Sequence, residues 1–406
     1  MRTHILLLLS AALASVTCVP ARAQQSAPPA AGHYLFAWTG DERQEGNDFL
    51  AVIDADPQSA SYGKLVASVG TDQKTVRIHH TEYVMPASGM LFANDHDVGR
   101  TFIFDVRDPL HPKVASSFAD MDGYMHPHSF VRLPNGNVLA TFQHGQRGRV
   151  AGQRGATGGL VEIDDSGKLV RSASNADPAF PDALLMPYGL VVLPAEDRVV
   201  STNSSMHNDD IFSGVTYQLW RLSDLKLLRT AYFDPGRDRY AHIGPQEPRA
   251  ADDGSVYVQT LSCGIERITG LNTTEPVAKL VHTFPGNWCG VPTIVGRYLI
   301  QSVPAIHGLI SLDLANPTAP IEVSRLSLSS GFRAHWTGWD AKTQRLVTTG
   351  SENRLFLVKL DSHSGALAVD EAFKDDDGRP GFDLANRKWP HGWTGTGLPH
   401  GVVFSR

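Results

Sequence analysis

The chain is poor in cysteine and in charge, and it lacks the short motifs on which several common enzyme classes depend. Only 3 of its 406 residues are cysteine, and 19% are charged. It contains no G-x-S-x-G, no H-E-x-x-H, no Walker phosphate-binding loop and no complete G-x-G-x-x-G. A hydrolase with a nucleophile elbow, a zinc protease of the H-E-x-x-H type and a nucleotide-binding enzyme are therefore without their signatures.

Long apolar runs are also missing, except near the start of the chain. Within residues 1–23, a basic residue precedes an apolar run from Ile5 to Val16, and the pattern A-R-A ends at Ala23. This pattern is typical of a cleaved signal peptide, and its apolar run is too short to span a bilayer. We therefore expect a periplasmic or secreted protein without a membrane span, cleaved near Ala23. Lipid attachment at Cys18 is an alternative, but the usual residues before such a cysteine are missing.

A concentration of basic residues is absent as well. The formal net charge is −6, and it becomes −8 when the two arginines of the first 23 residues are removed. No stripe of lysine and arginine stands out from this acidic background, so nucleic acid is not an expected partner. Residues 24–32, which follow the signal peptide, are rich in Gln, Pro and Ala and are expected to form a disordered leader.

A repeat of strand-like segments fills the rest of the chain. Runs rich in Val, Leu, Ile, Tyr and Phe recur with turn residues between them at a spacing of roughly 40 to 50 residues, which is typical of propeller blades. Six complete blades are expected at about 79–118, 126–174, 187–233, 245–283, 289–328 and 335–373. The sequence therefore predicts an all-β fold.

The seventh blade needs both ends of the chain. Residues 34–68 supply three strands, and residues 401–404 have the pattern of the missing innermost strand. We predict a seven-bladed β-propeller over residues 33–406, closed by pairing of the C-terminal strand with the N-terminal blade. Such a closure removes exposed sheet edges.

Two cysteines remain after cleavage, Cys263 and Cys289. A pair of cysteines in an exported chain suggests one disulfide. In the predicted blades, Cys263 lies in a loop between a second and a third strand, and Cys289 lies just before the first strand of the next blade. Both kinds of loop lie on one face of a propeller, so the two can meet. Thiol ligands or a redox pair are the alternative, although no C-x-x-C occurs.

Histidine recurs where the chain leads into a predicted innermost strand. The residues are His79, His80, His126, His128, His335 and His400. Because innermost strands line the axis of a propeller, these side chains are expected to converge there. Neutral imidazole binds copper, zinc, iron and nickel, and among first-row divalent ions copper is bound most tightly. The sequence therefore predicts an axial metal site, with copper as the expected ion.

The register of the blades ranks these candidates. Alignment on the first turn of each blade superposes three residues: His128, Tyr188 and His400. His126 lies two residues before His128 and shares its face of the strand. His79 aligns with His126 and is favoured over His80, because adjacent residues of a strand face opposite ways. His335 is one position out of this alignment.

Several segments together resemble the selenium-binding protein family, whose bacterial members include copper-dependent methanethiol oxidases. They are residues 48–57, Ser61-Tyr62-Gly63, His79-His80, His126-Pro127-His128 before residues 132–136, residues 158–164, Glu247 with Arg249, and Pro399-His400-Gly401. The similarity spans most of the mature chain and is closest in its first third. It implies a seven-bladed propeller with a histidine-bound metal, copper, at the axis, and oxidation of a small thiol or similar substrate with dioxygen.

Two classes of function follow from these observations. The first is an exported metal-dependent oxidase of a small thiol or related molecule, in which Tyr188 and Glu247 act as proton donor and acceptor. The second is a non-catalytic periplasmic protein that binds or carries metal, or that presents the propeller face to a partner. Titratable groups beside the metal that are not ligands favour the enzyme. The substrate, selenium binding and the oligomeric state do not follow from the sequence.

Overall fold

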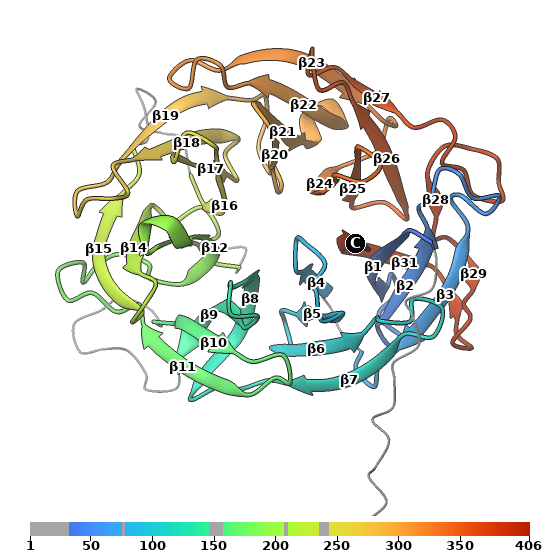
Figure 1. Ribbon diagram of the computed structural model, residues 1–406, viewed down its shortest axis with the longest axis horizontal. Helices are drawn as coiled ribbons and strands as arrows, with labels where there is room; N and C mark the ends of the chain where they lie inside the picture. The colour runs from blue at the N-terminus through green and yellow to red at the C-terminus, as the bar shows by residue number, and fades with distance from the viewer. Residues whose placement is uncertain (1–31, 75–77, 146–156, 207–209, 235–242) are drawn as a thin grey trace, which may run out of the picture.

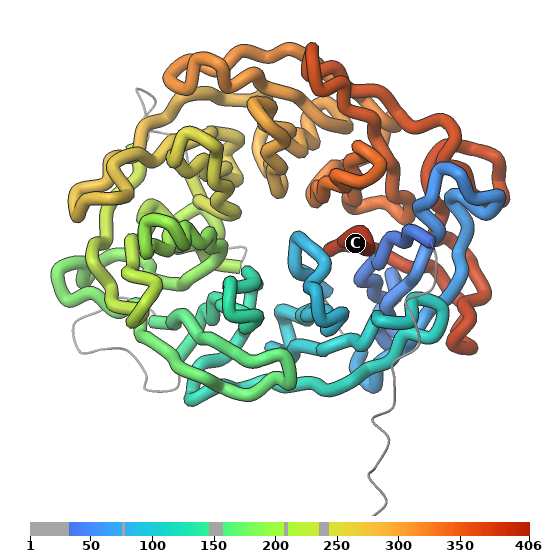
Figure 2. The backbone as a smooth tube through the Cα atoms, in the orientation of Figure 1, coloured from blue at the N-terminus to red at the C-terminus, as the bar shows by residue number. Residues whose placement is uncertain are grey.

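The protein is described by a computed structural model that covers residues 32–74, 78–145, 157–206, 210–234 and 243–406. The predicted signal peptide lies outside these residues, as does all but the last residue of the predicted leader. Seven antiparallel sheets stand around a central axis, and in each the strands run from the axis to the rim (Figures 1 and 2). The predicted seven-bladed β-propeller is confirmed.

The first three complete blades follow one another along the chain, and each begins with its innermost strand. The first consists of β4 (Ile78–Thr81), β5 (Met90–Asp95), β6 (Arg100–Asp105) and β7 (Lys113–Phe118). The second consists of β8 (Tyr124–Arg132), β9 (Val138–Gly145), β10 (Gly159–Ile163) and β11 (Leu169–Ser174). The third consists of β12 (Pro187–Leu193), β13 (Arg198–Asn203), β14 (Thr216–Arg221) and β15 (Lys226–Tyr232), with the short 3-10 helix η1 (Pro194–Glu196) between its first two strands.

Three further blades continue the same pattern. The fourth consists of β16 (Pro245–Ala250), β17 (Val256–Thr260), β18 (Gly264–Thr269) and β19 (Val277–Thr283). The fifth consists of β20 (Thr293–Val295), β21 (Tyr298–Val303), β22 (Gly308–Asp313) and β23 (Ile321–Ser327), with the 3-10 helix η2 (Pro304–Ile306) before β22. The sixth consists of β24 (Ala334–Asp340), β25 (Arg345–Gly350), β26 (Arg354–Leu360) and β27 (Leu367–Val369). All six begin and end within a few residues of the predicted positions.

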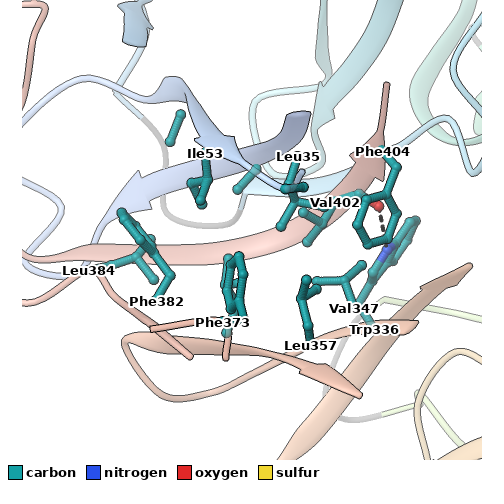
Figure 3. Packing of buried hydrophobic residues seen from close by; sticks show 14 of the residues in the cluster. Leu35, Ile53, Trp336, Val347, Leu357, Phe373, Phe382, Leu384, Val402 and Phe404 are labelled. Carbon is teal, nitrogen blue, oxygen red and sulfur yellow. Dashed lines mark hydrogen bonds between the residues drawn. The ribbon is translucent and has the colours of Figure 1, made fainter. Parts of the chain in front are cut away.

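The last blade joins the two ends of the chain, as predicted. It contains β1 (Tyr34–Asp41), β2 (Phe49–Asp54), β3 (Leu65–Gly70) and the innermost strand β31 (Gly397–Phe404). β31 pairs antiparallel with β1, and it begins four residues before the predicted strand. The indole Nε1 of Trp336 also donates to the backbone oxygen of Val402 at 3.0 Å, which ties β31 to β24. Figure 3 shows this hydrogen bond within the apolar core at the closure.

The middle strands are apolar on both faces because each blade is covered by a neighbour on either side. All six residues of β2 are buried, whereas the outermost strand β7 is largely exposed. Trp38 of β1 illustrates the packing between blades, since its ring lies 5.8 Å from that of Phe102 and 5.5 Å from that of Phe104. Such strands have continuous apolar runs in place of alternation, and these runs are the signal that located the blades.

The chain between β27 and β31 forms an excursion that the repeat did not predict. It contains β28 (Phe382–Asp383), which adds to β26, and a small hairpin of β29 (Arg387–Lys388) and β30 (Thr394–Gly395). Trp389 packs on Phe49 of β2, with ring centroids 4.4 Å apart. The excursion therefore covers the blade that closes the ring.

Two further expectations concern a disulfide and a membrane span. Cys263 and Cys289 form a disulfide, as the sequence predicts. Among the described residues, no helix is long and apolar enough to cross a membrane.

Candidate metal centre

Four imidazole side chains from three innermost strands meet on the propeller axis. His79 and His80 belong to β4, His128 to β8 and His400 to β31. The Nε2 atoms of His79 and His128 are 2.8 Å apart, and the ring centroids of His79 and His400 are 4.4 Å apart. One nitrogen each of His79, His80 and His400 lies within 4.8 Å of the other two. The first three histidines are buried, and His400 is half-buried.

A β-bulge presents these residues to the axis. In β4, two residues oppose one residue of β5, because Ile78 pairs with Asp95 while Thr81 pairs with Ala93. The innermost strands β8, β12, β16 and β31 have the same two-to-one irregularity, and β24 has one extra residue. The residues of these irregularities are 79–80, 128–129, 188–189, 246–247, 400–401 and 335. Bulges of this kind re-aim side chains next to functional sites.

The expectation that strand alternation turns His79 and His80 to opposite sides is wrong. Their rings are stacked, with centroids 4.0 Å apart and an angle of 10° between the planes. Inside the bulge, both residues lie opposite Asn94 of β5. The side-chain oxygen of Asn94 accepts from the backbone N–H of His80 at 2.7 Å. The amide nitrogen of Asn94 donates to the oxygen of Pro127 at 2.6 Å. Because this side chain replaces the ladder hydrogen bond, both imidazoles remain at the axis.

Glycine follows His400 and Tyr188 in two of the bulges because neighbouring backbone comes too close for a side chain. A Cβ atom on Gly401 would lie 2.4 Å from the backbone nitrogen of Thr81. A Cβ atom on Gly189 would lie 2.6 Å from the backbone oxygen of Gln246. The dipeptides His-Gly and Tyr-Gly in the sequence therefore reflect close contact between neighbouring innermost strands.

The backbone of Tyr188 fixes the proton of His128. The carbonyl oxygen of Tyr188 lies 3.0 Å from Nδ1 of His128, and because a carbonyl only accepts, Nδ1 carries the proton. The lone pair of Nε2 then points into the cluster, as it does in histidines that bind metal. The phenol ring of Tyr188 also lies against this imidazole, with ring centroids 3.7 Å apart. The predicted proton donor is therefore beside the histidines.

Glu247, the predicted proton acceptor, is fully buried below the same cluster. The hydroxyl of Ser129 donates to its Oε1 at 2.5 Å, and Nδ1 of His80 lies 3.4 Å from that oxygen. Burial raises the pKa of Glu247, while the guanidinium of Arg249 and the hydrogen bond from Ser129 act in the opposite direction. Together with His80 and His128, Glu247 forms a second set whose possible ligand atoms lie within 4.8 Å of one another.

An aromatic layer that sequence reasoning missed supports Glu247. The guanidinium of Arg249 lies over the ring of Tyr83 at 3.9 Å, and Tyr83 stacks on Trp336 with ring centroids 4.6 Å apart. Burial, and then the charge of Glu247, raise the pKa of Tyr83 well above its usual value, so the phenol keeps its proton. The only sequence signals were the position of Tyr83, three residues after His80, and the E-x-R spacing of Glu247 and Arg249.

Burial keeps the clustered imidazoles neutral. It lowers the pKa values of His79, His80 and His128 well below the usual value, and repulsion between neighbouring imidazoles acts in the same direction. Burial also lowers the pKa of His335 to about 4. Neutral imidazole is the form that a metal ion binds. The cluster therefore offers lone pairs at neutral pH without a prior loss of protons.

Two predicted ligands occupy different positions. Nδ1 of His126 lies 3.0 Å from the backbone oxygen of His96, and its ring is near that of His144, with centroids 5.0 Å apart. His335 lies against His400, with ring centroids 4.7 Å apart. Neither His126 nor His335 belongs to the two sets of converging ligand atoms among the described residues.

A funnel of about 770 Å³ leads from one face of the propeller to the histidines. Its inner end is lined by His79, Tyr188, His335 and His400. Its wall includes the apolar side chains of Ile211, Leu261, Trp288 and Leu398. A small molecule in this funnel can therefore reach both the imidazoles and the phenol of Tyr188.

Comparisons with known proteins agree with this architecture. No protein-family model matches the chain. Over 146 residues the chain is 32% identical to a methanethiol oxidase from Hyphomicrobium sp, a match that covers 34% of this chain and only 31% of that protein.

Solved structures resemble the whole propeller. A hypothetical selenium-binding protein from Sulfolobus tokodaii has a TM-score of 0.69 at 16% identity, over 92% of this chain and 93% of that chain. A periplasmic gluconolactonase from Pseudomonas aeruginosa has a TM-score of 0.60 at 14% identity, over 92% of this chain and 99% of that one. At these identities the structural matches show the fold alone. With the match to the methanethiol oxidase, they confirm the resemblance of this chain to the selenium-binding protein and methanethiol oxidase family.

Proposed function

We propose that this protein is an exported, copper-dependent oxidase that oxidises a small thiol or a related small molecule with dioxygen. The observation that carries this proposal is the convergence of His79, His80, His128 and His400 at the inner end of a funnel. The partial identity with a methanethiol oxidase supports the same class of reaction. In this proposal the chain is a divergent member of that family, with residues 33–406 forming its propeller domain.

The side chains present fit a transition metal. Among the described residues, Nδ1 of His79 and Nε2 of His80 are buried without a hydrogen-bond partner. A buried polar atom without a partner is costly, and an ion bound to Nε2 of His80 would remove that cost at this atom. A set of imidazoles with one carboxylate nearby suits copper, zinc, iron or nickel better than magnesium or calcium. His79, His80, His128 and His400 are the residues that would hold the ion.

Copper, when bound, supplies the one-electron steps through which electrons leave the thiol and reach dioxygen. The chain itself provides the proton transfers. Glu247, whose pKa is raised by burial, accepts from the hydroxyl of Ser129 and lies 3.4 Å from Nδ1 of His80, and we assign to it the proton that the thiol gives up. Tyr188 lines the funnel beside His128 and is placed to return a proton to reduced oxygen.

Metal content and oxygen consumption together test this proposal. The protein is expressed with its own leader, its metals are measured by mass spectrometry, and oxygen uptake is recorded with a panel of small thiols. We expect about one equivalent of copper and oxygen uptake that is lost in His128→Ala. His111→Ala is the matched control, because His111 is an exposed histidine paired with Asp108, outside the cluster.

Two outcomes would contradict the proposal in different ways. Less than about a tenth of an equivalent of any transition metal would leave a scaffold without a metal site. Normal copper content without oxygen uptake for any thiol would leave the second class of function, a non-catalytic protein that binds or carries metal.

A further inference from the structure

The funnel is large for the substrate that the family resemblance suggests. Methanethiol has one carbon and one sulfur, whereas a pocket of about 770 Å³ is in the range that encloses drug-sized ligands. The histidines occupy only its inner end. The remaining space can hold a larger body attached to the reacting sulfur.

One residue at the mouth combines a rare backbone conformation with an exposed apolar side chain. Trp288 has φ of +69°, in the left-handed region that a bulky side chain rarely adopts. Its indole is 49% exposed although it is a large apolar group. Both features are unfavourable for the folded chain by itself, and residues in such conformations are concentrated at functional sites.

The disulfide holds Trp288 in this position. The next residue, Cys289, is bonded to Cys263, which itself has φ of +66°. The backbone N–H of Trp288 donates to the oxygen of Leu261, another residue of the funnel wall, at 2.5 Å. The ring of Phe212 meets the indole edge to face, with centroids 5.3 Å apart and an angle of 71° between the planes. An aromatic surface is thus fixed at the rim of the funnel.

The apolar wall continues from this rim toward the histidines. Leu261 and Ile211 lie on the side of the third and fourth blades, and Leu398 of β31 lies on the closing blade. Aromatic rings prefer edge-to-face or offset contact with other rings, and such contacts add to the gain from burial. An aromatic body would therefore cover the exposed indole and fill the space that a one-carbon thiol leaves.

We infer that the substrate of this site is a thiol with an aromatic body, and that Trp288 binds that body at the mouth of the funnel. The reacting thiol group rests on the proposed function, whereas the binding of the aromatic body does not. Trp288 is then a specificity-determining residue, and the disulfide between Cys263 and Cys289 is the device that presents it.

Binding measured without turnover tests the inference. The full-length mature protein is titrated under anaerobic conditions, by calorimetry, with benzyl mercaptan, with benzyl alcohol and with ethanethiol. We expect benzyl mercaptan to bind about tenfold or more tightly than ethanethiol, and benzyl alcohol to bind measurably without any thiol. Trp288→Ala should reduce the preference for the aromatic thiol to less than about threefold, and Trp288→Phe should keep most of it.

The controls separate binding from folding. Tyr232→Ala removes an aromatic side chain that is 58% exposed on the outermost strand β15, and it should leave all three affinities unchanged. Trp288→Gly should lose the preference without lowering the melting temperature, because glycine adopts positive φ without strain. A large fall in melting temperature would show that Trp288 is a structural residue and would overturn the inference.

The remaining outcomes are also decisive. Equal affinity for benzyl mercaptan and ethanethiol, or an unchanged preference in Trp288→Ala, overturns the inference whatever the enzyme does. Tight binding of both aromatic probes without oxygen uptake overturns the oxidase and leaves the aromatic site standing. Oxygen uptake with ethanethiol but no preference for the aromatic thiol overturns the aromatic site and leaves the oxidase standing.

Discussion

The Nε2 atoms of His79 and His128 lie 2.8 Å apart, although 49 residues and the boundary between two blades separate these histidines along the chain. Nδ1 of His128 carries its proton, because it faces the carbonyl oxygen of Tyr188. His79 therefore either donates its own Nε2 proton to His128 or shares an ion with it. In both cases the two imidazoles depend on each other, and replacement of one disturbs the position of the other.

Metal binding should distinguish the histidines that converge from one that does not. His128→Ala removes a nitrogen from the cluster, and we expect copper affinity to fall by about 100-fold or more, since loss of even an outer partner of a ligand costs 10- to 100-fold. His126→Ala is the matched control, because His126 faces the backbone of His96. Copper titration with a competing chelator measures both. Equal losses in the two variants would place His126 in the metal site and contradict the geometry.

The positions of the blades followed from the sequence because both faces of a middle strand are buried. Continuous apolar runs at a regular spacing therefore marked each blade, and the strand-like C-terminus implied the closure on β1. The excursion that contains Trp389 was missed, because its strands are only two residues long and lie outside the repeat.

The site was predicted less completely than the fold, for a local reason. The recurrence of histidine at innermost strands identified His128 and His400, but the bulge that turns both His79 and His80 to the axis depends on Asn94 of the neighbouring strand. Serine occurs at many positions of this chain, so Ser129, which contacts Glu247, carried no signal of its own. Contacts between blades, which determine such roles, leave no spacing pattern in the sequence.

Glu247 should matter for turnover more than for metal content. Glu247→Gln keeps the size of the side chain and its contact with Ser129, but it removes the proton acceptor. We expect copper content to stay within about twofold, and oxygen uptake to fall by about 10² to 10⁴, the usual contribution of a general base. Glu352→Gln, a change at a carboxylate that contacts Ser329 and does not line the funnel, should leave both unchanged. Loss of copper in Glu247→Gln would instead make this carboxylate a ligand.

The ring closure includes a buried hydrogen bond between the first described residues and the sixth blade. Nε2 of His33 lies 2.7 Å from Oδ2 of Asp340, and both side chains are buried. We expect Asp340→Ala to lower the free energy of unfolding by about 2 kcal/mol, since it leaves Nε2 of His33 buried without its hydrogen-bond partner. Asp376→Ala, which breaks an exposed pair with Lys64, should cost less than about 1 kcal/mol. Urea unfolding measures both, and similar small losses would show that the closure does not need this pair.

The free energy of unfolding should fall as the pH rises, because the carboxyl of Glu266 in the fourth blade is buried. Burial raises the pKa of Glu266 to about 8 from a usual value of 4.5, and the charge of Asp234 acts in the same direction. Between these two pH values the folded chain holds a proton that the unfolded chain has lost. The contribution of this group to the free energy of unfolding is therefore largest at low pH and declines as the pH rises. The slope is about 1.4 kcal/mol per pH unit within that window.

Replacement of this carboxyl isolates its contribution to the pH dependence. Glu266→Gln stays neutral at every pH, so its free energy of unfolding should lack the decline that Glu266 adds between about pH 4.5 and pH 8. Urea unfolding at several pH values, compared with the unaltered protein, gives the difference. Glu322→Gln is the control, because Glu322 forms a partly exposed pair with Arg325, which lowers its pKa, so it stays charged above pH 5 in both states. If Glu266→Gln and the unaltered protein show parallel curves, Glu266 is charged in the folded chain and the raised pKa is contradicted.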